Sequence, residues 1–109
     1  MGVSDSKKLT SNPNYYYSYH RAGCADMNWV SNLFYIDNFK VYQIGEIYGN
    51  GCDTKEITIS IIELFDSETG LVLESKLEAL PIDTIETYDD YKWGFINDYW
   101  NKNFEKFKQ

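Results

Sequence analysis

Apolar and polar residues alternate along much of the chain between residues 15 and 79, with the two-residue period of a β-strand that has one buried face. Residues 56–65 show this best, because Ile57, Ile59 and Ile61 share one face before the phase shifts at Ile62. Such a phase shift indicates a bulge or burial of both faces. Shorter runs rich in strand-favouring residues cover residues 15–20, 28–36, 39–48 and 71–79. The pattern predicts four to five strands, with a short helix over residues 25–33 as the alternative to the second strand.

Turn-forming residues separate these runs. Asn50-Gly51 between two alternating runs is the strongest short-range hairpin signal in the sequence. Asp37-Asn38 tolerate positive φ and predict another tight turn. The run Asp-Ser-Glu-Thr-Gly at residues 66–70 predicts a third. Because strands joined by short turns usually pair with each other, we expect an antiparallel β-meander.

After Pro81 the period of the apolar residues changes to three and four, which indicates an amphipathic helix. Its apolar positions are Ile85, Tyr88, Tyr91, Phe95 and Tyr99, flanked by Ile96, Trp100, Phe104 and Phe107. Asp83 and Glu86 have the spacing of a capping pair, so the helix is expected to begin at about Asp83. Gly94 costs about 1 kcal/mol in a helix interior and predicts a bend or break. The fold class expected is α+β, with the C-terminal α-helix packed on one face of the meander.

Length and composition fit a single domain. The chain has 109 residues, of which 43% are hydrophobic and 17% aromatic, so one core can form. Residues 1–13 are polar and lack periodicity, which predicts a flexible N-terminal tail before a domain at 14–109. No apolar run reaches the roughly 18 to 20 residues of a membrane span. No export signal is recognisable, so a cytoplasmic location is expected unless a signal peptide has been removed.

Cys24 and Cys52 are the only cysteines, and they lack the CxxC spacing of a zinc or redox site. Two interpretations remain. The pair forms a disulfide if the protein is exported, or it stays as two thiols in a reducing cytosol.

The net charge of −7 is concentrated in the middle of the chain. From Glu46 to Asp98 there are thirteen acidic residues and three lysines, whereas the flanking segments are slightly basic. A negative field repels nucleic acids and anionic membranes, so a basic protein partner is favoured over direct nucleic-acid binding. The alternative is that the acidity only keeps a small protein in solution. The acidic residues that we expect to contact a partner are Glu63, Glu74, Glu78, Asp89 and Asp90.

Tyrosines gather at residues 15–19 and supply rigid contact area of the kind found in protein-binding surfaces. In a strand, alternate residues of this run lie on opposite faces. One face is expected in the core and the other in contact with a partner, although alternation does not decide which is which. The contact residues predicted from this run are Tyr15, Tyr17 and Tyr19.

The chain shows no catalytic or metal-binding motif. His20 is the only histidine, and its spacing from Cys24 does not make a Cys–His pair, because such pairs are assembled in three dimensions. With seventeen acidic residues, neighbouring carboxylates such as Asp89-Asp90 are expected by chance. Residues 49–51 lack the context of a phosphate loop, and residues 66–70 lack the ligands of a calcium loop. We therefore expect no enzyme activity, no metal and no cofactor.

Two classes of function fit these features. In the first, the protein is an inhibitor or immunity protein that covers a basic surface on a nucleic-acid-handling toxin or defence effector. In size, charge and composition the chain resembles small acidic bacterial immunity proteins and phage-encoded anti-defence proteins, which implies an antidote role. In the second, it is an extracytoplasmic accessory or lipoprotein-type domain with a Cys24–Cys52 disulfide, and its acidity is incidental.

Overall fold

The computed structural model describes residues 5–24, 27–66 and 68–108. The strands of this part of the chain are β1 (Asp5–Lys8), β2 (Tyr15–Gly23), β3 (Asn28–Asp37), β4 (Lys40–Asn50), β5 (Glu56–Asp66) and β6 (Leu71–Pro81). They are followed by the 3-10 helix η1 (Ile82–Thr87), the α-helix α1 (Tyr91–Asn103) and the 3-10 helix η2 (Phe104–Phe107).

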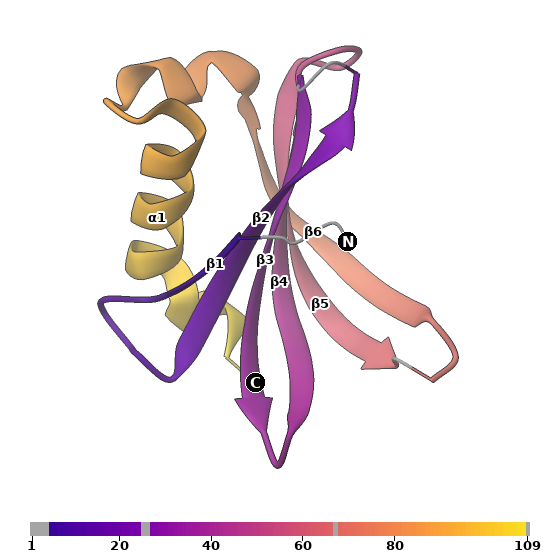
Figure 1. Ribbon diagram of the computed structural model, residues 1–109. Helices are drawn as coiled ribbons and strands as arrows, with labels where there is room; N and C mark the ends of the chain where they lie inside the picture. The colour runs from indigo at the N-terminus through magenta and orange to yellow at the C-terminus, as the bar shows by residue number, and fades with distance from the viewer. Residues whose placement is uncertain (1–4, 25–26, 67, 109) are drawn as a thin grey trace.

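The strands form one sheet in the order β1-β2-β3-β4-β5-β6, and each neighbouring pair is antiparallel. Helix α1 lies across one face of this sheet (Figure 1). The predicted meander with a C-terminal helix is therefore confirmed. The predicted number of four to five strands is wrong, because the described residues form six. The short helix considered for residues 25–33 is not formed by the described residues, since β3 begins at Asn28.

The additional strand, β1, lies in the segment that we expected to be a flexible tail. Lys7 pairs with Tyr17 and Lys8 pairs with Tyr16 along the edge of β2. Leu9, directly after β1, is buried in the core. A run of polar residues carries no periodic signal, and this one becomes a strand only because a neighbouring strand offers its backbone groups. The tail prediction is corrected for residues 5–9, while residues 1–4 lie outside the described residues.

The predicted hairpins are present, but their turns differ in detail. Between β3 and β4 the two residues with positive φ are Asn38 and Phe39, one position later than expected. Between β4 and β5 the loop runs over residues 51–55, longer than the two-residue turn that Asn-Gly suggests. The Asn50 side chain stabilises this loop, because its Oδ1 accepts hydrogen bonds from the backbone N–H groups of Cys52 and Asp53. The phase shift at Ile62 coincides with a register irregularity between β5 and β6.

The core lies between α1 and the sheet. It is rich in aromatic and β-branched side chains: Leu9, Tyr17, Trp29, Leu33, Ile44, Ile47, Ile57, Ile59, Phe95, Ile96, Tyr99, Trp100 and Phe107. Trp100 Nε1–H donates a hydrogen bond to Ser31 Oγ at 2.9 Å and so ties α1 to β3. Gly45 allows the close approach of the C-terminal segment, because a Cβ there would lie 2.7 Å from the ring of Phe107.

The helical region begins differently from the prediction. Asp83 lies in η1, no side chain caps η1, and α1 begins only at Tyr91. The interruption therefore precedes Tyr91, whereas Gly94 lies inside α1. A Cβ on Gly94 would lie 3.0 Å from Cβ of Tyr88, so the glycine lets the chain fold back closely at the start of α1. Gly94 therefore serves close packing against Tyr88 and does not interrupt α1.

Candidate protein-interaction site

A disulfide joins Cys24, directly after β2, to Cys52 in the β4–β5 loop, with a Cα–Cα distance of 6.3 Å. The sequence left open a disulfide or two free thiols, and the structure contains the disulfide. We call this end of the sheet the disulfide end. Helix η1 lies at the same end, because the N–H of Ile82 donates a hydrogen bond to the Lys55 carbonyl at 2.9 Å. The opposite end, with the β1–β2, β3–β4 and β5–β6 turns, is the hairpin end (Figure 1).

Exposed carboxylates gather at the disulfide end. They come from the β4–β5 loop, the start of β5, η1 and the residues before α1: Asp53, Glu56, Asp83, Glu86, Asp89 and Asp90. Two of the predicted contact residues, Asp89 and Asp90, belong to this group. Chain segments that are separate in sequence thus bring exposed carboxylates together at one end of the fold.

The other three predicted acidic contacts lie along β5 and β6. Glu63 accepts a hydrogen bond from Ser75 Oγ at 2.8 Å, and Glu78 accepts one from the hydroxyl of Tyr99 at 2.7 Å. Glu74 is exposed on β6. Burial first, and then the hydrogen bond and charge of Glu78, raise the pKa of Tyr99 well above its ordinary value. Glu63 and Glu78 are thus hydrogen-bonded within the fold.

Glu74 also affects a carboxylate that the sequence did not single out. Glu46 on β4 is half-buried, and burial is the largest cause of the raised pKa of its carboxyl group. The charge of Glu74 and a hydrogen bond with it add to this effect. Glu46 and Glu74 therefore bring two acidic groups together on the sheet, away from the exposed carboxylates of the disulfide end.

The tyrosine run turns its Tyr15, Tyr17 and Tyr19 face toward α1. Tyr17 is 2% exposed, and its hydroxyl donates a hydrogen bond to Asn97 Oδ1 at 2.9 Å. Tyr15 and Tyr19 are partly buried against the same core. A partner cannot reach the side chain of Tyr17 while α1 is in place. The face of β2 that points away from α1 carries Tyr16, whose ring stacks on Phe34 with centroids 5.6 Å apart.

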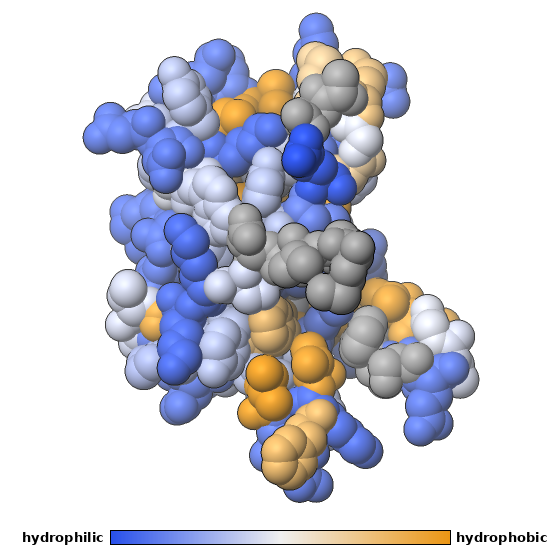
Figure 2. Space-filling model, viewed as in Figure 1, coloured by the Kyte–Doolittle hydropathy of each residue, from blue (hydrophilic) through white to orange (hydrophobic). Residues whose placement is uncertain are grey.

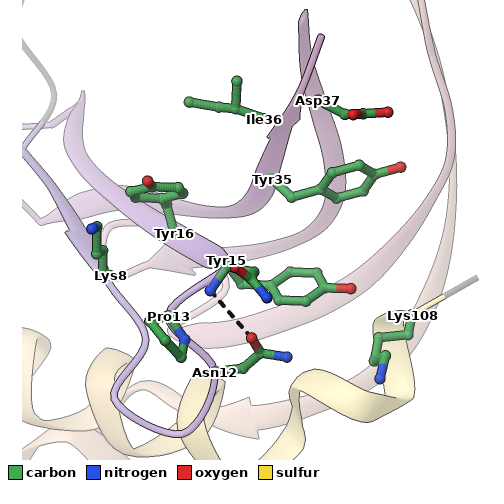
Figure 3. A pocket seen from close by; sticks show the side chains of 10 residues that line it. Lys8, Asn12, Pro13, Tyr15, Tyr16, Tyr35, Ile36, Asp37 and Lys108 are labelled. Atoms are coloured by element: carbon green, nitrogen blue, oxygen red, sulfur yellow. Dashed lines mark hydrogen bonds between the residues drawn. The ribbon is translucent and has the colours of Figure 1, made fainter. Parts of the chain in front are cut away.

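The hairpin end exposes apolar side chains and a broad hollow. Ile36, Phe39 and Val41 are exposed around the β3–β4 turn. Figure 2 shows hydrophobic side chains at this end of the molecule, in the lower part of the view. Beside this turn lies a cavity of about 630 Å³, shown in Figure 3. Its lining residues are Lys8, Asn12, Pro13, Asn14, Tyr15, Tyr16, Tyr35, Ile36, Asp37 and Lys108. The lining contains two lysines and one aspartate, so this larger hollow does not offer the negative surface that the acidic residues create elsewhere.

A smaller and more apolar pocket lies among the carboxylates at the disulfide end. Its volume is about 330 Å³. It is lined by Met27, Trp29, Gly51, Ile82, Asp83, Ile85, Glu86 and Lys92, and we call it the acid-rimmed pocket. None of its lining residues was among the predicted contact residues, because they come from three separate segments and only the fold brings them together.

The groups considered for catalysis are not among the residues that line this pocket. Cys24 has no free thiol, since it is bonded to Cys52. His20 is exposed on β2. In the part of the chain that the structure describes, no three His, Cys, Asp or Glu side chains are grouped as metal ligands.

Comparison with known proteins does not assign the chain to a family. No family model, curated protein or solved structure matches it. Among the described residues, no helix has the length and apolar character needed to cross a lipid bilayer.

Proposed function

We propose that the chain is a small binding protein whose disulfide end docks on a basic protein and inhibits it. The observation that carries this proposal is the group of exposed carboxylates around an apolar pocket at that end. Charges of one sign on a surface speed the encounter with an oppositely charged partner and disfavour nucleic acid as the direct ligand. Apolar contact area at the same place can then hold the complex, because buried apolar anchors dominate dissociation.

Within this class we propose an inhibitor or antidote that covers a nucleic-acid-binding surface of a toxin or defence effector. Such surfaces are basic because they neutralise phosphates, so an acidic protein of this size can block them by electrostatic mimicry. The disulfide does not separate this proposal from an extracytoplasmic accessory domain, because an exported inhibitor also carries disulfides. The bonded state of Cys24 supports a binding role rather than thiol chemistry.

The test begins with affinity capture from the native host and identification of a basic protein that co-purifies. Association and dissociation rates are then measured with the double variant Asp89→Lys/Asp90→Lys. We expect slower association at low salt by about 10-fold or more, with the difference shrinking as salt rises. The captured protein is also assayed for nuclease or nucleic-acid-binding activity with and without the chain.

Glu68→Lys/Glu105→Lys is the matched control, because both residues are exposed away from the disulfide end and the change in net charge is the same. This control should associate much faster than Asp89→Lys/Asp90→Lys. Equal rates for the two double variants would show that only the total charge matters. Unchanged association of Asp89→Lys/Asp90→Lys at low salt would refute the proposed site.

A further inference from the structure

The acid-rimmed pocket has walls that are already in place without a ligand. Gly51 N–H donates hydrogen bonds to the Met27 carbonyl at 2.9 Å and to Asn28 Oδ1 at 3.1 Å. A Cβ at Gly51 would lie 2.6 Å from the Met27 carbonyl oxygen, so only glycine permits this approach. The Cys24–Cys52 disulfide joins the same two turns. A pocket held in this way loses little entropy when a ligand enters.

The indole of Trp29 forms part of the wall of this pocket. Its side chain is completely buried, and Nε1 has no hydrogen-bond acceptor in the described structure. The corresponding atom of Trp100 is paired with Ser31. Nε1 of Trp29 packs against Gly49 and has no accessible surface, so the indole offers the pocket an apolar wall rather than a hydrogen-bond donor.

The rim selects the charge of the ligand. Asp83 and Glu86 are exposed at the edge of the pocket, and Lys92 is the one cation among the lining residues. The volume of about 330 Å³ is near the lower limit for small-ligand sites and has room for one large apolar side chain. A side chain that enters here is flanked by carboxylates, so basic neighbours are favoured and acidic neighbours are repelled.

We propose that the acid-rimmed pocket takes one aliphatic or aromatic side chain from a lysine- or arginine-flanked segment of the partner. This inference rests on the proposed function and adds the recognition element. The carboxylates steer the basic segment, and the apolar side chain anchors it in the pocket that Trp29 helps to line.

The test is a titration of the ¹⁵N-labelled, disulfide-bonded chain with three capped pentapeptides, followed by NMR. The first has leucine between two pairs of lysines, the second has alanine in place of the leucine, and the third has leucine between two pairs of glutamates. We expect the leucine–lysine peptide to shift the Trp29 indole and Gly51 amide resonances. The alanine peptide should bind about 10-fold more weakly or worse, since it buries much less apolar area. The glutamate peptide should not bind.

Met27→Glu and Ile36→Glu form a matched pair of variants for this titration. Met27 is 50% exposed on the pocket wall, and Ile36 is 53% exposed at the hairpin end. Both changes add one negative charge, which by itself would strengthen binding of a basic peptide. We expect Met27→Glu to lower the affinity for the leucine–lysine peptide about 10-fold. Ile36→Glu should leave this affinity unchanged or raise it slightly.

Three results would overturn the inference: resonance shifts located away from the pocket, equal affinity for the leucine and alanine peptides, or equal binding by the two variants. The outcome is separable from that of the proposed function. If the captured basic protein is sensitive to Asp89→Lys/Asp90→Lys but indifferent to Met27→Glu, the docking end is right and the pocket anchor is wrong. If the peptide binds as expected while no basic protein responds to charge reversal, the pocket stands and the proposed function fails.

Discussion

The β3–β4 turn predicts an unusual stabilising substitution, Phe39→Gly. Phe39 has φ 66° and its side chain is fully exposed. A left-handed conformation costs a non-glycine residue about 1–2 kcal/mol, whereas a glycine in its place costs about 0.5–1 kcal/mol of extra unfolded-state entropy. The exposed ring loses no buried contact when it is removed. We therefore expect a net gain of about 0.5–1 kcal/mol and a rise in Tm of about 2–8 °C.

Phe39→Ala is the control, because alanine removes the ring but keeps the Cβ that causes the strain. Its stability should stay within about 0.5 kcal/mol of the original. The assay is urea unfolding followed by tryptophan fluorescence, with a thermal melt by circular dichroism and the disulfide intact. If alanine stabilises as much as glycine, the ring rather than the backbone is the cause. If glycine destabilises, Phe39 makes a contact that its exposure does not show.

Three further predictions concern the core and the disulfide. Gly49→Ala places a Cβ against the indole of Trp29, so we expect the free energy of unfolding, measured in urea, to fall by about 1–3 kcal/mol. An unchanged free energy of unfolding would show that the indole can move aside. The disulfide links residues 28 positions apart, so reducing it, or replacing both cysteines by serine, should lower the free energy of unfolding by about 3–4 kcal/mol. A decrease of less than about 1 kcal/mol would indicate that the unfolded state without the disulfide keeps residual structure. Tyr99→Phe should cost about 1 kcal/mol at pH 7. The raised pKa of Tyr99 keeps its phenol neutral in the folded state, whereas the unfolded chain ionises near pH 10. The stability that Tyr99 contributes is therefore present at neutral pH and is lost as the pH rises through about 10. The free energy of unfolding of the Tyr99→Phe variant should fall less than that of the original between pH 9 and 11.

The strands were predictable because their signal is local. Alternation placed β3, β4, β5 and β6 with ends within about two residues of those observed, and the phase shift at Ile62 marked a real irregularity in the ladder. The turn at Asn38 was also local, since few residues tolerate positive φ. By contrast, β1 was missed because its residues are polar and gain strand structure only by pairing with β2.

The candidate site was predictable only in part. Asp89 and Asp90 were expected contacts and do lie in the exposed acidic group at the disulfide end. Glu78 was expected beside them but accepts a hydrogen bond from Tyr99 within the fold. Tyr17 was assigned to a binding face and lies under α1. A two-residue period divides a strand into two faces, but only the position of the covering helix decides which face is buried.

The amino-acid sequence by itself determined the antiparallel meander, the C-terminal helical period, and the excess of negative charge in the middle of the chain. These properties depend on neighbours within a few residues, where backbone preference and side-chain alternation act directly. The tertiary structure decided the pairing of Cys24 with Cys52, the late start of α1 at Tyr91, and the assembly of the acid-rimmed pocket from three segments. Such features depend on which distant segments meet, and that is set by the packing of the whole core rather than by any local pattern.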